Sequence, residues 1–411
     1  MIVPPWPNGG SANVFEACVA AHAAAGRDVH LLIAPDQPSV CARPQDRADV
    51  TERMTFAGAV ATEVLLPAPR WRNWLNRRRH RLRRAAGNAI DFWGANVAAR
   101  RLPPVLRETL RARRPVEMIH VHHCWNMPLA VLLARRTRRS GGGRPRLICE
   151  THDVQSQNMD VIEGSRWINP SFDRAALVEA ETRMCRMADL LVHINTADEK
   201  VFRERLPQAR HSHLGPTIAP STEAGLRALR VGTRTPADKL VYVATSNYWN
   251  IATVVWLIEE VLPHAPRLAD HLRIYGDVRE GLQRVRPDLH AAHSPLLCGR
   301  VARVADAYAE ACGILVPALA GSGSSIKLLE GLCTGRPLLG TTGVTRGVPA
   351  ELVARMPIEV HDEAEAFARA ALGIVEARDS FVRRGGEVFD RHYSNAAFRD
   401  RLATILGGLQ D

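Results

Sequence analysis

A short apolar run, followed by small residues and a helix-forming stretch, constrains the fold of this chain more than any other feature. Residues 313–317 (Gly-Ile-Leu-Val-Pro) are apolar and bounded by glycine and proline, which is typical of a buried parallel strand. Residues 321–325 (Gly-Ser-Gly-Ser-Ser) follow, and the pattern beyond them predicts a helix that begins near Ser324 or Ser325. We therefore expect a strand, a small-residue loop and a helix in direct succession.

The start of this helix has the composition of a site for a nucleotide diphosphate. Backbone N–H groups in a small-residue turn, at the positive end of a helix dipole, favour an anion without a metal ion. Lys327 adds a point charge for a phosphate, and Glu330 lies nearly one turn further on, on the same side, where it can accept ribose hydroxyls. The alternative is a flexible turn followed by a surface Lys327–Glu330 pair worth about 0.2–0.5 kcal/mol.

The order of these residues, with Gly-Arg-Pro at 335–337, resembles the donor site of retaining GT-B glycosyltransferases of family 4. Members commonly carry two glutamates, the first on the donor sugar and the second on the nucleotide ribose. Glu330 matches the second, and Ser322 stands at the first, as in a branch of the family that reads Gly-Ser-Gly here. The resemblance implies Lys327 and His152 as catalytic residues and a donor-binding set of Gly10, Ser322, Gly323, Ser324, Ser325, Lys327, Glu330, Asn247 and Arg300.

Near the N-terminus, residues 4–11 look like the first glycine-rich loop of this family. Gly9 and Gly10 let the backbone approach a ligand closely, and Ser11 can cap a helix predicted over residues 12–25, which ends at Gly26. The alternative is a strand-to-helix turn without a ligand. With the resemblance, we expect Gly9 and Ser11 on the acceptor side of the site.

Two predicted strands in the first half run into histidine-rich loops, at residues 118–125 and 147–153. The second resembles the family's Thr-His-Asp segment, so His152 is expected to contact the donor sugar or the acceptor, with Asp153 on the acceptor side orienting the imidazole. His120 and His122 alternate with apolar residues and point one way, and His123 points the other. Because no clustered carboxylate completes a site, we predict no metal ligands here.

In the second half, residues 240–250 look like the first strand and loop of the family's nucleotide-binding domain. Asn247 and Asn250 are loop formers, and an amphipathic helix is predicted from Thr253 to Leu262, with Glu259 and Glu260 exposed and Pro263 closing it. Relatives place an arginine and a lysine after this strand, but none occurs between Val241 and Pro263, so Lys327 is expected to carry more of the charge. Residues 297–301, which include Arg300, resemble the turn that cradles the nucleobase.

The length of 411 residues suits two domains of roughly 200 residues each. The resemblance implies an α/β fold of the GT-B type, with two Rossmann-like, doubly wound parallel-sheet domains that face each other across a cleft. We expect an N-terminal domain over residues 1–215, completed by a C-terminal helix at about 388–411, and a nucleotide-sugar-binding domain over residues 216–387. Prolines accumulate between residues 206 and 238, which is typical of a crossover between domains.

Positive charge is concentrated in one segment, Arg70–Arg84, where eight of fifteen residues are arginine, within a formal net charge of +11. Trp71 and Trp74 lie among these arginines, as in segments that dock on an anionic membrane. The alternatives are a solvated basic segment, or a nucleic-acid footprint in which arginines contact phosphates and tryptophans stack on bases. No nucleic-acid motif accompanies the segment, so we favour the membrane surface and expect no nucleic-acid partner.

Other global features predict a cytoplasmic protein, peripheral on the inner face of a membrane. The sequence lacks the basic start and apolar stretch of a signal peptide, and no apolar run approaches the ~18–20 residues needed to span a bilayer. Eight cysteines are scattered without a Cys-x-x-Cys pair, which suits a reducing compartment.

These observations together predict a retaining hexosyltransferase without a cofactor. It would move a sugar from a nucleotide diphosphate sugar to a hydroxyl of a glycan or polyprenyl-linked glycan, in exopolysaccharide or cell-envelope synthesis. No Asp-x-Asp occurs in the chain, so we expect no metal ion at the diphosphate. The alternatives are a nucleotide-sugar epimerase on the same fold and a nucleic-acid-binding protein that uses Arg70–Arg84.

Overall fold

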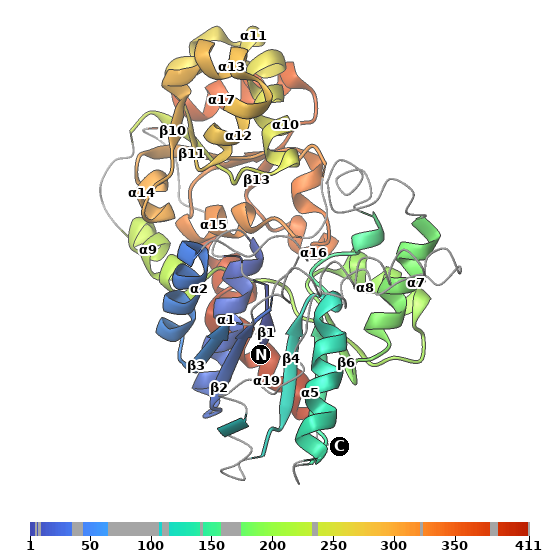
Figure 1. The fold of residues 1–411 in the computed structure, drawn as a ribbon. Coiled ribbons are helices and arrows are strands. Elements are labelled where there is room, and N and C mark those ends of the chain that lie inside the picture. The colour runs from blue at the N-terminus through green and yellow to red at the C-terminus, as the bar shows by residue number, and fades with distance from the viewer. Residues whose placement is uncertain are drawn as a thin grey trace. The chain divides into compact units, whose positions relative to one another are not determined.

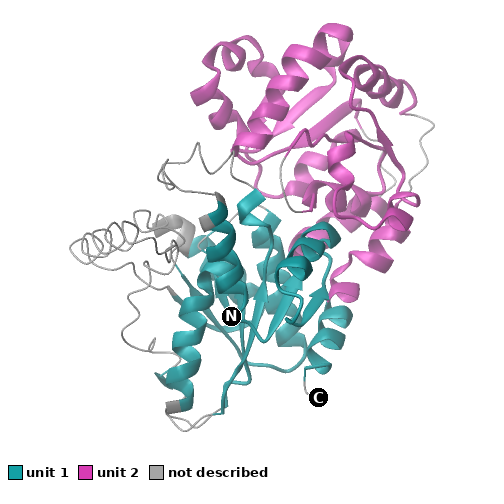
Figure 2. Ribbon diagram, turned by 90° about the vertical axis from the view of Figure 1, so that its right-hand side faces the viewer, with its two compact units in different colours: residues 1–215, 399–411 teal, residues 216–398 magenta. Residues whose placement is uncertain are grey.

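The chain folds into two compact units, each built around its own parallel sheet (Figure 2). Unit 1 comprises residues 1–215 and 399–411, and unit 2 comprises residues 216–398. The computed structural model describes residues 1–4, 6, 10–34, 44–64, 107–108, 115–139, 143–157, 174–231, 237–320, 324–378 and 385–409. The basic segment Arg70–Arg84, and with it the predicted membrane-docking surface, lies outside these residues.

Unit 1 contains a sheet with the strand order β3-β2-β1-β4-β5-β6-β7, in which every described pair is parallel (Figure 1). The strand order reverses between β1 and β4, as in doubly wound folds. The strands are β1 Ile2–Val3, β2 Val29–Ile33, β3 Ala59–Val64, β4 Met118–His122, β5 Arg146–Glu150, β6 Leu190–His193 and β7 His211–His213.

The helices of unit 1 enclose two apolar cores, in which side chains from opposite faces of the sheet take part. Val3 and Ile33 pack with Phe15 and Val19 of α1, whereas Ile2 packs with residues of α5 and α7 in the other core. This alternation follows from the two-residue period of a strand. The helices are α1 Gly10–Ala24, α2 Pro44–Phe56, α5 Met127–Arg139, α7 Arg174–Cys185 and α8 Thr196–Arg205, with 3₁₀ turns at Cys124–Asn126 and Gln155–Gln157.

Unit 2 contains a parallel sheet with the order β10-β9-β8-β11-β12-β13, which reverses between β8 and β11. Leu240 and Tyr242 of β8 face one core and Val241 faces the other. The strands are β8 Lys239–Val243, β9 Leu272–Tyr275, β10 Leu297–Gly299, β11 Ala311–Val316, β12 Leu338–Gly340 and β13 Ile358–Val360.

Helices cover both faces of this second sheet (Figure 1). The core on one face contains residues of α10, α12 and α17, and the core on the other contains residues of α9, α14, α15 and α18. The helices are α9 Pro220–Val231, α10 Tyr248–Trp256, α11 Leu262–His264, α12 Val278–Val285, α13 Pro287–Ala292, α14 Val304–Ala309, α15 Ile326–Thr334, α16 Ala350–Val353, α17 Ala364–Glu376 and α18 Gly386–His392, with a π-helical turn at Leu257–Val261 and 3₁₀ turns at Pro266–Asp270, Ser294–Leu296 and Thr342–Thr345. The last helix, α19 Asn395–Gly407, begins in unit 2, and its residues from Arg399 onward belong to unit 1.

The predicted strands at residues 313–317, 118–125 and 147–153 are confirmed, as β11, β4 and β5 with their following loops. Two helix starts were predicted too late. α1 begins at Gly10, so Ser11 is its second residue and not its cap. α10 begins at Tyr248, because Asn247 supplies the cap, and Asn250 is therefore helical and not part of a loop.

Pro263 does not close the helix, contrary to the prediction from its position. The chain passes from α10 through the π-helical turn into α11, and Pro263 lies in the first turn of α11. A proline is tolerated there because its missing N–H is not needed in a first helical turn. Glu259 and Glu260 are exposed on the π-helical turn, as expected.

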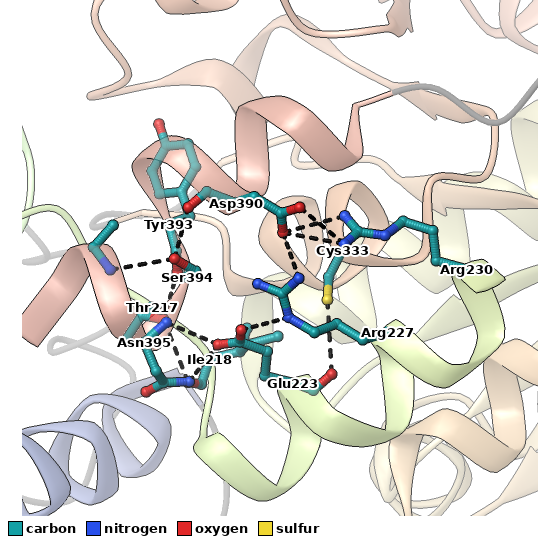
Figure 3. A network of polar contacts seen from close by, with 11 residues as sticks. Thr217, Ile218, Glu223, Arg227, Arg230, Cys333, Asp390, Tyr393, Ser394 and Asn395 are labelled. Carbon is teal, nitrogen blue, oxygen red and sulfur yellow. Dashed lines mark hydrogen bonds and ion pairs between the residues drawn. The ribbon is translucent and has the colours of Figure 1, made fainter.

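A polar network joins the segment where the chain enters unit 2 to the segment where it leaves (Figure 3). Thr217 Oγ1 donates to the Tyr393 carbonyl at 2.5 Å, and Asn395 Nδ2 donates to the Ile218 carbonyl at 3.1 Å. Glu223 of α9 accepts two further hydrogen bonds from Asn395, at 2.8 and 2.6 Å. These contacts fix α9 and the start of α19 side by side within unit 2.

Ion pairs extend this network to α18 (Figure 3). Arg227 of α9 contacts Glu223 at 2.6 Å and Asp390 at 2.7 Å, and Arg230 contacts the same aspartate at 2.9 Å. Because these groups are only partly buried, we assign the network to orientation of the helices and not to a large gain in stability.

In the described part of the chain, no helix combines the length and apolarity required to cross a bilayer.

Candidate functional site

The carboxyl ends of β8 and β11 meet where the strand order of unit 2 reverses. Open parallel sheets bind ligands at this position, because the loops that follow the two strands lead to opposite faces and leave a crevice between them. Here β8 leads to α10 and β11 leads to α15, so the two helices begin on either side of the reversal. Of the donor-binding residues predicted for unit 2, Asn247 lies in the loop after β8, Ser324 and Ser325 directly precede α15, and Lys327 and Glu330 lie on α15.

Asn250 links the two sides of the reversal. Its Nδ2 donates to the Thr245 carbonyl at 2.9 Å, which fixes the side chain against the loop after β8. Its Oδ1 accepts from Lys327 Nζ at 2.8 Å and from the Tyr242 hydroxyl at 3.3 Å. Lys327, at the start of α15, is thus held by Asn250 of α10. The sequence did not predict this contact, because the two residues are far apart in the chain.

The start of α15 has the capping geometry that the sequence predicted. Ser325 is the N-cap, and its Oγ accepts from the backbone N–H of Leu328 at 3.4 Å. The other N–H groups of the first turn have no carbonyl partner within the helix, which is the arrangement that favours an anion. Ser324 lies directly before the cap, while Ser322 and Gly323 lie outside the described residues.

Lys327 and Glu330 have different partners and are not an exposed surface pair. Glu330 is only 8% exposed, and its Oε2 accepts from the Tyr308 hydroxyl at 2.9 Å. Burial raises the pKa of Glu330 to about 7, against the hydrogen bond from Tyr308 and the charge of Lys327. The interpretation of these residues as a weakly interacting surface pair is therefore wrong.

Burial also affects Lys327, whose ammonium lies 5.3 Å from the centre of the Tyr242 ring. Loss of solvation lowers the pKa of Lys327 to about 8, although the charge of Glu330 opposes this shift. An anion beside the ammonium would favour its charged form, so a bound phosphate and the protonated lysine stabilise each other.

Close packing holds the loop after β11 in position. Thr341 Oγ1, just after β12, accepts from Ala318 N and donates to the Ala318 carbonyl, both at 2.9 Å. Gly343 passes so near that a Cβ there would lie 2.1 Å from the Ala318 carbonyl oxygen. In the Gly-Arg-Pro segment, Gly335 ends α15 with a φ of 70°, and Arg336 donates to the Ala309 and Ala311 carbonyls. The contacts of Thr341 and Gly343 with Ala318 fix the start of the loop after β11.

Asn247 and Arg300 lie at the same edge of the sheet. The Asn247 side chain accepts from the N–H of Asn250 at 2.8 Å, as the cap of α10. Arg300 follows β10 and contacts Asp277 Oδ2 at 3.7 Å, while Oδ1 of Asp277 accepts from Ser246 N at 2.8 Å. Asp277 thus joins the loop after β8 to the turn that carries Arg300.

In unit 1, the corresponding reversal lies between β1 and β4. Gly10 and Ser11 form the first turn of α1 after β1, and Gly9 lies outside the described residues. His123 and His152 follow β4 and β5 and have φ values of 67° and 58°, a conformation that costs a residue with a side chain about 1–3 kcal/mol. Their rings stack with centroids 4.3 Å apart.

His152 is buried and contacts His122 and Glu150. Its Nε2 lies 2.9 Å from His122 Nδ1 and 3.5 Å from Glu150 Oε1. Burial lowers the pKa of His152 to about 4, so the imidazole is neutral at pH 7 and can both donate and accept a hydrogen bond. Asp153, which we expected to orient the ring, follows it in the chain, but the carboxylate found against Nε2 is that of Glu150.

Glu150 is the residue that the analysis of the sequence missed. The premise that no carboxylate joins the histidines is wrong, because Glu150 Oε2 lies 3.4 Å from His120 Nε2 and 3.7 Å from His122 Nδ1. His120 and His122 do share one face of β4, as expected, with stacked rings whose centroids are 4.9 Å apart. The available signal was the position of Glu150 two residues before His152 at the end of a buried strand.

Comparison with known proteins concerns the fold and the family of part of the chain. Residues 237–377 match the family described as glycosyl transferases group 1. Similar solved structures include Anabaena HepE in complex with UDP and glucose (12% identity, TM-score 0.61, 99% of each chain covered). They also include HepE in complex with UDP-glucose (13% identity, TM-score 0.60, 99% of each chain). No curated protein sequence matches the chain significantly.

A third solved structure, sucrose-phosphate synthase from Thermosynechococcus elongatus, is 14% identical, with a TM-score of 0.60 over 99% of this chain and 98% of that chain. At such identities the similarity concerns the fold alone. The GT-B prediction, with two parallel-sheet α/β domains, is confirmed. The chain thus has a GT-B fold, and residues 237–377 of it match the glycosyl transferases group 1 family.

We predict that Glu330→Gln stabilises the protein more at pH 8 than at pH 5, relative to the parent. Since folding raises the pKa of Glu330 from 4.5 to about 7, the parent loses stability as the pH rises through this window. That shift corresponds to about 3 kcal/mol above pH 7, and a glutamine does not ionise. Thermal unfolding followed by circular dichroism at both pH values measures the difference in Tm.

The matched control for this measurement is Glu260→Gln, which changes an exposed carboxylate in the same unit. Its Tm relative to the parent should be the same at pH 5 and pH 8. A Glu330→Gln variant whose relative Tm is likewise independent of pH would contradict the assignment of a buried, ionisable Glu330.

Proposed function

We propose that this protein is a glycosyltransferase that moves a sugar from a nucleotide diphosphate sugar to an acceptor hydroxyl. The observation that carries the proposal is the position of Lys327 and Glu330 at the start of α15, beside the reversal of strand order in unit 2. Lys327 is held there by Asn250 at 2.8 Å and Glu330 by Tyr308 at 2.9 Å. The match of residues 237–377 to the group 1 family supports the proposal, as do the complexes of HepE with UDP and UDP-glucose.

In the proposed donor site, each part of the nucleotide sugar contacts protein groups that complement its charge or its hydrogen-bonding groups. The diphosphate binds the N–H groups at the start of α15 and the ammonium of Lys327. Because Tyr308 occupies Oε2 of Glu330, Oε1 is the oxygen that accepts the ribose hydroxyls. Asn247, Arg300 and Gly10 complete the contacts with the nucleotide, and Ser322, Gly323, Ser324 and Ser325 surround the sugar and its phosphate.

The proposed reaction retains the anomeric configuration and needs no metal ion or other cofactor. The bond between the anomeric carbon and the diphosphate oxygen breaks, and the acceptor oxygen forms a bond to the same carbon on the same face. The acceptor's proton passes to the departing diphosphate, whose remaining charge Lys327 and the helix N–H groups stabilise. His152, neutral at pH 7, hydrogen-bonds the sugar or the acceptor, with Gly9, Ser11 and Asp153 on the acceptor side.

We place the enzyme within family 4, with a hexose as the transferred sugar and a glycan or polyprenyl-linked glycan as the acceptor, in exopolysaccharide or cell-envelope synthesis. An acceptor in a bilayer requires an enzyme that reaches its surface. The eight arginines of Arg70–Arg84 supply the charge for a peripheral position on the cytoplasmic face.

Donor binding tests the site directly. We predict that the protein binds a nucleoside diphosphate in titration calorimetry with UDP, ADP and GDP, and that Mg²⁺ or Mn²⁺ does not change the Kd. Lys327→Met should raise the Kd about 10–100-fold, because a charge-assisted hydrogen bond contributes about 1.5–3 kcal/mol and 1.4 kcal/mol corresponds to tenfold. Glu330→Gln should also weaken binding.

Lys200→Met, which changes an exposed lysine of α8 in unit 1, is the matched control and should leave the Kd unchanged. The donor site would be overturned if folded parent protein bound none of the three nucleotides. Parental affinity in Lys327→Met would overturn the role of that lysine.

The anomeric configuration of the product tests the mechanism. With an α-linked nucleotide sugar and an accepted sugar alcohol, we predict an α-linked product, because attack and departure occur on one face. The coupling constant of the anomeric proton in the NMR spectrum distinguishes the two anomers. A β-linked product would exclude retention, and a donor epimerised without an acceptor would favour the alternative of a nucleotide-sugar epimerase.

Vesicle sedimentation tests the basic segment. Replacing Arg77, Arg78, Arg79 and Arg81 by glutamine should lower partitioning onto anionic vesicles up to about a thousandfold, because each basic residue near such a surface contributes about 1 kcal/mol. Neutral vesicles should bind neither protein. Equal partitioning of parent and variant onto anionic vesicles would remove this segment from the proposal.

A further inference from the structure

Four buried side chains of unit 1 converge between α1 and the sheet. Cys18 comes from α1, His120 and His122 from β4, and Glu150 from the end of β5. Each offers one ligand atom, and these atoms all lie within 4.8 Å of one another. All four residues are at most 1% exposed, so water does not solvate them. Sulfur, imidazole nitrogen and carboxylate oxygen are the three kinds of ligand that zinc takes in proteins.

The distances within the cluster fit the spacing of ligands around one ion. From Glu150 Oε2, His120 Nε2 lies at 3.4 Å, Cys18 Sγ at 3.5 Å and His122 Nδ1 at 3.7 Å. Zinc bonds of about 2.0–2.3 Å in a tetrahedron separate the ligand atoms by roughly 3.3–3.8 Å. The other pairs of ligand atoms lie at most 4.8 Å apart, so rotations of these side chains are needed to bring all four atoms into coordination.

The contacts within the protein leave this cluster incompletely satisfied. His120 Nε2 and Glu150 Oε1 are buried without a hydrogen-bond partner, and the hydrogen bond that Glu150 Oε2 accepts is from the Cys18 thiol, a weak donor. A buried polar atom without a partner costs about 1–3 kcal/mol, and a buried carboxylate costs more. Two such atoms within a buried cluster of four potential ligand side chains indicate a ligand that satisfies them together.

We propose that Cys18, His120, His122 and Glu150 bind one zinc ion. As ligands, the cysteine is a thiolate, the glutamate a carboxylate and the two imidazoles are neutral, so their total charge of −2 balances the charge of Zn²⁺. The ion removes the cost of burying the separate charges, because the complete site is neutral. With four protein ligands and no open position, the zinc is structural.

Neighbouring histidines provide the outer contacts that metal ligands require. His22, one turn beyond Cys18 on α1, has its Nε2 3.1 Å from His120 Nδ1 and accepts the proton of that nitrogen, which leaves His120 Nε2 for the ion. With zinc on His122 Nδ1, the N–H of His152 Nε2 turns to Glu150 Oε1, now 3.5 Å away. Each contact orients one ligand.

The zinc ion would join α1 to the centre of the sheet. α1 begins directly after the loop that follows β1, and His122 and Glu150 are the last residues of β4 and β5. A single ion thus fixes three elements at the carboxyl edge of unit 1. The proposal concerns unit 1 alone and does not depend on the donor site proposed in unit 2.

Metal binding by the full-length protein tests the site. After removal of metal by a chelator, titration with Zn²⁺ against a chromophoric indicator should show one equivalent bound per chain. Cys18→Ala and His120→Ala should lower the affinity at least about 100-fold, and His22→Ala about 10–100-fold, as a residue that orients a ligand. Cys312→Ala, which removes a buried cysteine of unit 2, is the matched control and should bind as the parent does.

Cobalt(II) reports on the ligands of the ion by its absorption spectrum. In the parent, Co²⁺ should give the charge-transfer absorption of a cobalt thiolate and the intense visible bands of tetrahedral coordination. Cys18→Ser should lose the charge-transfer band. Folded parent that binds less than one equivalent of Zn²⁺, or binds Co²⁺ without a thiolate band, would overturn the proposal. Parental zinc affinity in Cys18→Ala would also overturn it.

Discussion

The hydrogen bond from Lys327 to Asn250 joins the two halves of the unit 2 sheet where the strand order reverses. At such a reversal, the loops that follow the two strands lead to helices on opposite faces of the sheet. A contact between the two sides fixes the position of these loops relative to each other. Here the contact involves a lysine that is partly removed from water, with a pKa of about 8. The contact between Lys327 and Asn250 forms without a ligand, and the lysine ammonium supplies a positive charge for an anionic ligand.

Burial also shifts the pKa of Glu330, which lies beside Tyr308 and has a pKa of about 7. The folded protein holds two ionisable groups, one turn apart on α15, in environments that disfavour their charged forms. In the proposed donor site, a ligand with negative phosphates and neutral hydroxyls would relieve part of this cost. The stability lost in burying the two groups would then contribute to the binding energy, since both depend on the same desolvation.

Unit 1 has a different polar interior on the same sheet topology. In this unit one face of β4 carries His120 and His122 towards α1, while Ile119 and Val121 fill the core on the other face. A strand with histidines on its buried face would weaken a sheet if their nitrogens had no partners. His22 of α1 and His152 are the partners of the Nδ1 atoms of these two histidines, whereas His120 Nε2 has none, and a bound ion would supply it. Glu150 also contacts His152, so the interior cluster reaches the carboxyl edge of the sheet.

The sequence by itself determined the elements whose signals are local. An apolar run bounded by glycine and proline predicted β11, and β4 and β5 were predicted as strands that run into loops. The start of α15 was predicted near Ser324 or Ser325, because burial of a strand and capping of a helix depend on neighbouring residues. The early start of α10 and the passage through Pro263 were missed, since Asn247 reads equally as a loop residue and as a cap.

Only the tertiary structure decided which side chains meet. Lys327 and Asn250 are 77 residues apart, Glu330 and Tyr308 are 22 apart, and Cys18 and Glu150 are 132 apart. Such contacts depend on which strands are neighbours in the sheet and on which face each helix packs. A parallel sheet brings the ends of distant strands to one edge, so its polar sites are assembled by topology and cannot be read from spacing along the chain.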